Sequence, residues 1–135
     1  MRILTLSRDN STVIKAINKL ENAEVITLAG PDASSFANVM TFMDKDEMMP
    51  GDFAKMVLRY LKKYDCKACV LDRGLPGIGR IKKDLNDEGY FVCFLITITE
   101  KVTAWSDGGM KPTIRVHVAG VEFNCPDGSI KNFRA

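Results

Sequence analysis

Acidic, basic and hydroxyl side chains gather in three short segments, each of which directly follows an apolar run typical of a β-strand. The segments are 7–10 (Ser-Arg-Asp-Asn), 30–34 (Gly-Pro-Asp-Ala-Ser) and 72–80 (Asp-Arg-Gly-Leu-Pro-Gly-Ile-Gly-Arg). Because the carboxyl ends of parallel strands meet at one edge of a sheet, we expect the three segments to lie together and to bind a ligand there. The residues expected at this site are Ser7, Arg8, Asp9, Asp32, Asp72, Arg73, Gly77, Gly79 and Arg80.

The chemistry of this set suits either an anion or a small cation. Guanidinium groups and glycine N–H groups bind phosphate, so one interpretation is a phosphate-bearing or nucleotide ligand held by the glycine-rich loop 74–80. Carboxylates bind Mg²⁺, and Asp9 and Asp72 are the residues that would hold it. The alternative interpretation is that these polar residues only form loops and cap helices.

The apolar pattern around these segments predicts alternating strands and helices. Short apolar runs at 3–6, 24–29 and 68–71 predict strands, whereas residues spaced three and four apart predict helices over 13–20, 36–43, 53–64 and 78–85. Ser34 or Ser35 is expected to cap the second of these helices. The order β-α-β-α-α-β-α predicts a parallel sheet with right-handed crossovers.

The pattern changes after Tyr90. A long apolar and then alternating strand is predicted from 91 to 105, followed by a turn at 106–109, a strand over 113–123, a turn at 125–128 and a short edge strand over 129–133. The predicted fold is therefore one α/β domain over 1–135: a three-layer sandwich with a mixed sheet, parallel and flavodoxin- or receiver-like at its N-terminal strands, with a C-terminal antiparallel hairpin.

The hairpin offers an edge strand, which suits homodimer pairing or β-augmentation by a protein partner. The residues expected to contact that partner are Trp105, Lys111, Arg115 and His117.

The central stretch Val70-Leu-Asp72-Arg-Gly-Leu-Pro76-Gly77 resembles the phosphoacceptor segment of response-regulator receiver domains. In that family an aspartate ends the third strand, with proline four residues later and often glycine after it. The opening 1–11 is also similar to a receiver's first strand and first helix. The resemblance covers residues 1–85 and implies that Asp72 matches the phosphorylated aspartate.

The rest of the receiver motif departs from the family pattern. The adjacent acidic pair that holds Mg²⁺ in receivers falls on Ser7 and Arg8, and the hydroxyl position falls on Thr97 or Thr99. Lys111-Pro112 matches the family's Lys-Pro, but it comes one helix too early. Arg8 would repel a cation and could pair with Asp72. The resemblance therefore implies a pseudo-receiver, a regulatory protein-binding module without a phosphorylation cycle.

A second resemblance concerns the loop alone. Leu75-Pro-Gly-Ile-Gly79 is similar to the turn of helix-hairpin-helix DNA-binding motifs, in which backbone N–H groups hold a DNA phosphate. Lys83 stands where that motif has a small residue, and 68–71 predicts a strand where the motif has a helix. Weak DNA-backbone binding through this loop is the alternative this resemblance leaves open.

Composition limits the classes of function that remain. With 19 basic and 17 acidic residues, the net charge of +2 is too balanced to predict a nucleic-acid or membrane partner. No apolar run approaches the roughly 20 residues of a membrane span, and no signal-peptide pattern opens the chain, so we expect a cytoplasmic protein. No nucleophile–base pair is visible around His117, the single histidine, so we expect no catalysis.

Four cysteines raise the question of a metal or redox site. Cys66 and Cys69 form a C-x-x-C, but they stand where a helix ends and a strand begins, and no second close pair completes a zinc site. The prediction is that Cys66, Cys69, Cys93 and Cys125 are buried structural thiols.

Overall fold

One six-stranded mixed sheet runs through the molecule, with strand order β2-β1-β3-β4-β5-β6. The computed structural model describes residues 1–106 and 108–134, with side chains described except at 104–106 and 110–112. The strands are β1 (Arg2–Thr5), β2 (Glu24–Thr27), β3 (Ala68–Val70), β4 (Phe91–Ser106), β5 (Gly109–Asn124) and β6 (Ile130–Arg134). The helices are α1 (Asn10–Ile17), α2 (Pro31–Asp44), α3 (Pro50–Lys63) and α4 (Ile78–Asp87).

The first four strands in the sheet order are parallel, and β4, β5 and β6 are antiparallel. Two buried clusters lie on the two faces of this sheet, as the alternation of strand side chains requires. Helix α1 packs with Ile3, Val70 and Cys93 on one face, whereas α2, α3 and α4 pack with Leu4 and Val92 on the other. These contacts confirm the predicted three-layer α/β sandwich with its mixed sheet.

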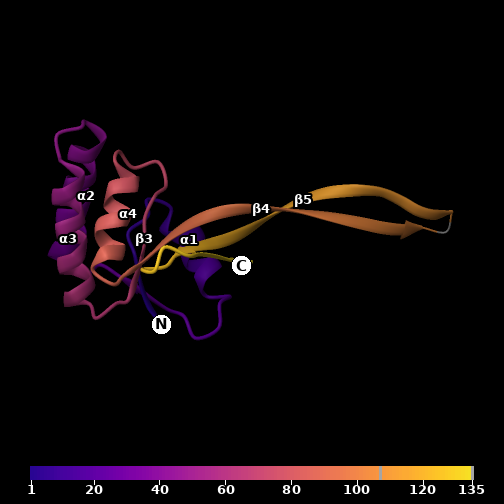
Figure 1. The fold of residues 1–135 in the computed structure, drawn as a ribbon, viewed down its shortest axis with the longest axis horizontal. Helices are drawn as coiled ribbons and strands as arrows, with labels where there is room; N and C mark the ends of the chain where they lie inside the picture. The colour runs from indigo at the N-terminus through magenta and orange to yellow at the C-terminus, as the bar shows by residue number, and fades with distance from the viewer. Residues whose placement is uncertain (107, 135) are drawn as a thin grey trace.

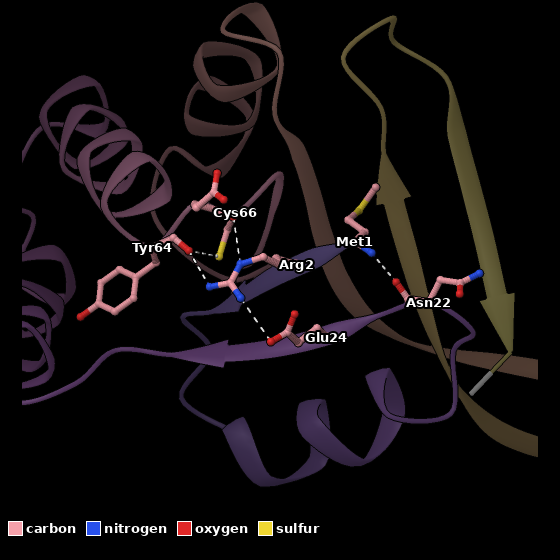
Figure 2. A network of polar contacts seen from close by, with 7 residues as sticks. Met1, Arg2, Asn22, Glu24, Tyr64 and Cys66 are labelled. Atoms are coloured by element: carbon pink, nitrogen blue, oxygen red, sulfur yellow. Dashed lines mark hydrogen bonds and ion pairs between the residues drawn. The ribbon is translucent and has the colours of Figure 1, made fainter.

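Two hydrogen-bonding groups of Arg2 tie the start of β1 to the end of α3 (Figure 2). The Arg2 guanidinium donates to the backbone carbonyl of Tyr64 at 2.9 Å and to that of Asp65 at 3.1 Å, and it pairs with Glu24 of β2. The last carbonyls of a helix have no partner within the helix, so a cation there stabilises the helix end. These contacts join the first residues of β1 and β2 to the end of α3, so this end of the strands has a structural role.

Helix α2 begins earlier than its serines predict. The helix starts at Pro31 behind Gly30, and no side chain caps it, so Ser34 and Ser35 lie inside the helix and the predicted cap is wrong. Proline at the first helical position lacks the N–H that would be unpaired there, and its fixed φ suits the helix. Gly30 adopts φ +54°, which turns the chain from β2 into the helix.

The long strands β4 and β5 extend far beyond the helical body as a two-stranded ribbon (Figure 1). Strand β3 pairs with β4 only over Phe91–Cys93, and β6 pairs with β5 only over Gly120–Asn124. Residues 97–106 and 109–119 therefore pair only with each other, and we call this segment the arm. The ten residues of β4 in the arm span roughly 30 Å at the usual rise of a strand.

Among the described residues, no helix is both long enough and apolar enough to cross a membrane. All four cysteines are free and buried, as predicted. Burial raises the pKa of the Cys66 thiol, raises that of Cys69 to about 12, and places that of Cys93 well above the ordinary value.

These raised pKa values predict unreactive thiols in the folded protein. The nucleophile in thiol chemistry is the thiolate, which at pH 8 is a very small fraction of a thiol whose pKa is about 12, as for Cys69. We expect Cys69 and Cys93 to react with a chromogenic disulfide reagent only after urea unfolding. Rapid labelling of either residue in the folded protein, located by peptide mass spectrometry, would contradict this.

Candidate functional site

The best-connected polar cluster lies between the carboxyl ends of β1 and β3. The chain leaves β1 for β2 on one side, whereas β3 lies on the other side of β1, so this position is the topological switch point of the parallel strands. Backbone pairing continues one residue past each strand, because Leu6 N–H donates to Val70 and Leu71 N–H donates to Cys93. Ser7 and Asp72 therefore leave the sheet at the same level.

The Asp72 carboxylate is held from both sides by the segment that follows β1. Ser7 Oγ donates to Asp72 Oδ1 at 2.6 Å, and the backbone N–H of Arg8 donates to Oδ2 at 3.1 Å. Arg8 Nε lies 3.9 Å from the same oxygen. The half-buried carboxylate is thus surrounded by a hydroxyl, a backbone amide and a guanidinium.

Arg8 and Asp9 complete the cluster, and each also contacts a helix. The guanidinium of Arg8 forms an ion pair with Asp44 at the end of α2. Asp9 caps α1 by accepting from Thr12 N–H at 3.4 Å, and hydrogen bonds from the side chain and backbone of Thr12 lower the pKa of Asp9. We call Ser7, Arg8, Asp9, Asp44 and Asp72 the switch-point cluster.

The Ser7–Asp72 hydrogen bond predicts a stability contribution. Ser7→Ala removes a donor to a carboxylate, and we expect a loss of about 1–2 kcal/mol in the free energy of unfolding from urea denaturation. Ser35→Ala, at an exposed position inside α2, is the matched control and is expected to be neutral or slightly stabilising. A double-mutant cycle of Ser7→Ala with Asp72→Asn that shows no coupling would contradict the role of this bond.

Asp32 lies apart from this cluster. It accepts from Lys63 Nζ at 2.6 Å and from Tyr64 Oη at 2.7 Å, both at the end of α3. The hydrogen bonds from Lys63 and then from Tyr64 lower the pKa of Asp32, and the hydrogen bond to Asp32 raises the pKa of Lys63. Tyr64 Oη also accepts from Ala29 N–H at 3.1 Å, so this group fastens α3 to the end of β2.

Arg73 and Arg80, the basic residues of the 72–80 loop, also turn away from Asp72. Arg73 binds both carboxylate oxygens of Glu122 on β5, at 2.9 and 3.0 Å, and lies over the ring of Phe94. Arg80 pairs with Asp84 one turn along α4. The loop thus connects β3 to the base of the arm rather than presenting its cations to one point.

Gly77 and Gly79 have different requirements. Gly77 precedes α4 with φ +67°, and a Cβ added there would lie 2.3 Å from the side chain of Pro50 at the start of α3. Gly79 lies within α4 and has open space around it. Gly77 therefore serves close packing of two helix starts, whereas Gly79 has no such constraint.

This difference gives a paired prediction. Gly77→Ala is expected to lower the free energy of unfolding by about 2 kcal/mol or more. Alanine is strained in the left-handed conformation of this position, and its Cβ would also clash with Pro50. Gly79→Ala is expected to be neutral or to stabilise by up to about 1 kcal/mol, because alanine favours helix. Equal effects of the two variants in urea denaturation would contradict this reading of the loop.

The predicted Mg²⁺ ligands do not form a larger acidic group in the structure. Among the described residues, no three His, Cys, Asp or Glu side chains gather as a metal site. Asp72 is near Asp9 through Ser7, whose Oγ accepts from Asp9 N–H at 3.1 Å, but Arg8 lies between them in the chain and contacts Asp72 itself.

Of the residues that correspond to receiver positions, Thr97 and Thr99 are exposed on the arm. Lys111 lies in β5 close to the turn of the hairpin, so its backbone is at the far end of the arm from Asp72. The side chains of Lys111 and Trp105 lie outside the described residues. Arg115 and His117 are exposed on one face of the arm, opposite Lys101 and Thr99 respectively.

Sequence reasoning missed the partners of these residues. Asp44, Glu122 and Tyr64 each complete an ion pair or hydrogen bond with a residue at least 32 positions away in the chain. Glu122 could have been noticed because it interrupts the apolar positions near the end of β5. Asp44 lies in an acidic run that reads only as a solvated helix end, and no local signal links it to Arg8.

Comparison of the sequence with protein-family models finds no match, and comparison with curated proteins finds none either.

Proposed function

We propose that this chain is a non-catalytic protein-binding module whose binding element is the arm, and that a second copy of the chain is its partner. The body supplies a receiver-like scaffold, in which the parallel strands follow the order 2-1-3-4 of flavodoxin-like sheets. In this scaffold Asp72 is engaged by Ser7 and Arg8, so binding is assigned to the arm rather than to phosphoryl chemistry.

The observation that carries the proposal is an uncovered apolar face on the arm. Ile98, Val102, Ile114, Val116 and Val118 share one face, because the pairs Ile98↔Val118 and Val102↔Ile114 lie directly opposite across the ribbon. The side chains of Val102 and Ile114 are among the exposed large hydrophobic residues, at 44% and 54%. An apolar patch of this kind marks an interaction surface.

The covering helices end before this face begins. Phe94 and Ile96 on the same face of β4 pack against the cluster formed by α2, α3 and α4. Beyond Ile96 no helix follows the ribbon (Figure 1). A two-stranded ribbon is marginally stable alone in water, whereas three or more strands with a hydrophobic face are more stable, so a partner that adds strands beside the arm would also stabilise it.

The two edges of the arm differ. The base of β5 is already paired with β6, and Pro112, which has no N–H, interrupts its distal edge. Strand β4 contains neither proline nor glycine and pairs with β3 only over its first three residues. The outer edge of β4 is therefore the edge suited to backbone pairing with another strand.

A second copy fits this edge by symmetry. Two β4 edges related by a twofold axis perpendicular to the sheet would pair antiparallel and keep both apolar faces on the same side. The four-stranded sheet that results would carry ten β-branched side chains on one face, with Glu100 of each copy, paired to Arg134, among them. In this dimer neither arm would remain a two-stranded ribbon.

The experiment is the oligomeric state measured by sedimentation velocity over a range of protein concentrations. We expect a reversible dimer with a micromolar Kd. Val102→Lys with Ile114→Lys places two like charges on one rung of the apolar face, and we expect the dimer Kd to rise by a factor of ten or more, or about 1.4 kcal/mol.

The next rung supplies the matched control. Thr103 and Thr113 face each other on the opposite side of the ribbon, so Thr103→Lys with Thr113→Lys adds the same charge to the other face. This variant is expected to keep the dimer. A wild-type protein that remains monomeric at several hundred micromolar, or equal losses in both variants, would contradict the proposal.

A further inference from the structure

The face of the arm opposite its apolar residues has a distinct chemistry. Four successive rungs of the ribbon project from it, and the eight side chains are all exposed. The rungs are Thr97·Ala119, Thr99·His117, Lys101·Arg115 and Thr103·Thr113. We call these residues the threonine–basic face. It contains four hydroxyls, two permanent cations and an imidazole, and no carboxylate.

The central rung places two cations directly opposite each other. Like charges at opposite positions of an antiparallel pair destabilise it. Among the residues whose side chains are described, neither Lys101 nor Arg115 forms an ion pair. The neighbouring carboxylate of Glu100 is on the other face and is held by Arg134 at 3.0 Å. The described part of the chain thus leaves this concentrated positive charge without a paired carboxylate.

The rungs on either side of these cations are ordered by cross-strand contacts. Thr99 Oγ1 lies 3.1 Å from His117 Nδ1, and the hydroxyls of Thr103 and Thr113 lie 3.5 Å apart. Hydroxyl and imidazole groups held in place beside cations are donors of the kind that contact phosphate and sugar oxygens.

Positive charge continues from the arm to its base on the same side of the sheet. Lys131 lies opposite Phe123, whose side chain belongs to the cluster under α1. Lys19, just past the end of α1, lines the same groove as Lys131. Glu21 lines this groove beside Lys19 and Lys131, whereas Glu100 and Glu122 of the strands β4 and β5 are on the opposite face of the sheet.

From this arrangement we propose that the threonine–basic face of the arm binds duplex DNA, with Lys101 and Arg115 on phosphates. A two-stranded β-ribbon fits the major groove, which is about 12 Å wide. The arm, roughly 30 Å long, would lie in the groove for part of one helical turn, whose axial rise is about 34 Å. The deep, narrow major groove of duplex RNA does not admit such a ribbon.

The two proposals concern opposite faces of the arm, because the two faces of a strand point in opposite directions. A four-stranded sheet of paired arms, at about 4.8 Å per strand, is wider than the major groove, so the arm binds DNA as the two-stranded ribbon of the monomer. It also differs from phosphate binding by the loop 75–79, which lies at the start of α4 and not on the arm. A test therefore needs variants that remove each surface individually.

The test is fluorescence anisotropy of a labelled 20-base-pair DNA duplex titrated with the full chain, at salt concentrations from 50 to 200 mM. We expect saturable micromolar binding at the lowest salt and a steep fall in affinity as salt rises. Lys101→Ala with Arg115→Ala should weaken binding at least tenfold and reduce the slope of log K against log salt by about 2. Circular dichroism should show an unchanged fold.

The charge-matched control is Arg59→Ala with Lys62→Ala, two exposed cations of α3 on the far side of the body (Figure 1). This variant, and Gly79→Asp in the loop, should bind DNA as the wild type does. Absence of binding at 50 mM salt, an equal loss in the α3 control, loss in Gly79→Asp without loss in the arm variant, or equal affinity for an RNA duplex would each overturn the proposal.

Discussion

The structure depends on one constraint, which is that β4 is covered on both faces only over its first few residues. Val92 and Phe94 pack under α2, α3 and α4, whereas Cys93 packs under α1. Where these helices end, the same strand continues without cover, with β5 as its only neighbour. The body therefore holds the base of the arm in place. The ion pair between Arg73 and Glu122 contributes to this, because it joins the loop after β3 to β5.

This change of cover also explains why the strand pattern in the sequence changes. In β5 the positions 114, 116 and 118 are apolar, but the buried hydrophobic residues near its end are Val121 and Phe123, which have the other parity. On the arm only one face is apolar, and the even-numbered residues form it. At the base the odd face is buried under α1, and the even face there carries Gly120 and Glu122. A periodicity of two thus holds locally in each part and reverses between them.

The fold class and the element order could be predicted from the sequence because they follow from local patterns. Helix α3 (Pro50–Lys63) contains most of the stretch 53–64 whose apolar spacing predicts a helix, and the parallel order of the early strands follows from the crossovers. The start of α2 could not be predicted, because serine caps and an N-terminal proline both favour a helix start and only the turn at Gly30 decides between them.

The candidate site was predictable only in part, for a related reason. That Ser7, Arg8, Asp9 and Asp72 meet follows from parallel topology, which brings strand ends together. The positions of Asp32 and Arg73 depend on long-range partners, since each is drawn away by an opposite charge that no local pattern connects with it, whereas Arg80 pairs with Asp84 one turn along α4. Proximity at a sheet edge therefore does not by itself assemble a ligand site when the same charges can pair elsewhere.

A comparison of the two surfaces shows where binding energy remains. At the switch point, donors and acceptors already satisfy one another: Asp72 is held by Ser7 and Arg8, and Asp9 caps α1. A ligand there must first break these contacts and gains only the difference. The arm instead keeps an unpaired strand edge, an uncovered apolar face and an uncompensated pair of cations. A partner that pairs with this edge, packs on the apolar face or supplies anions would gain binding free energy. The arm is therefore the part of the described chain best suited to binding.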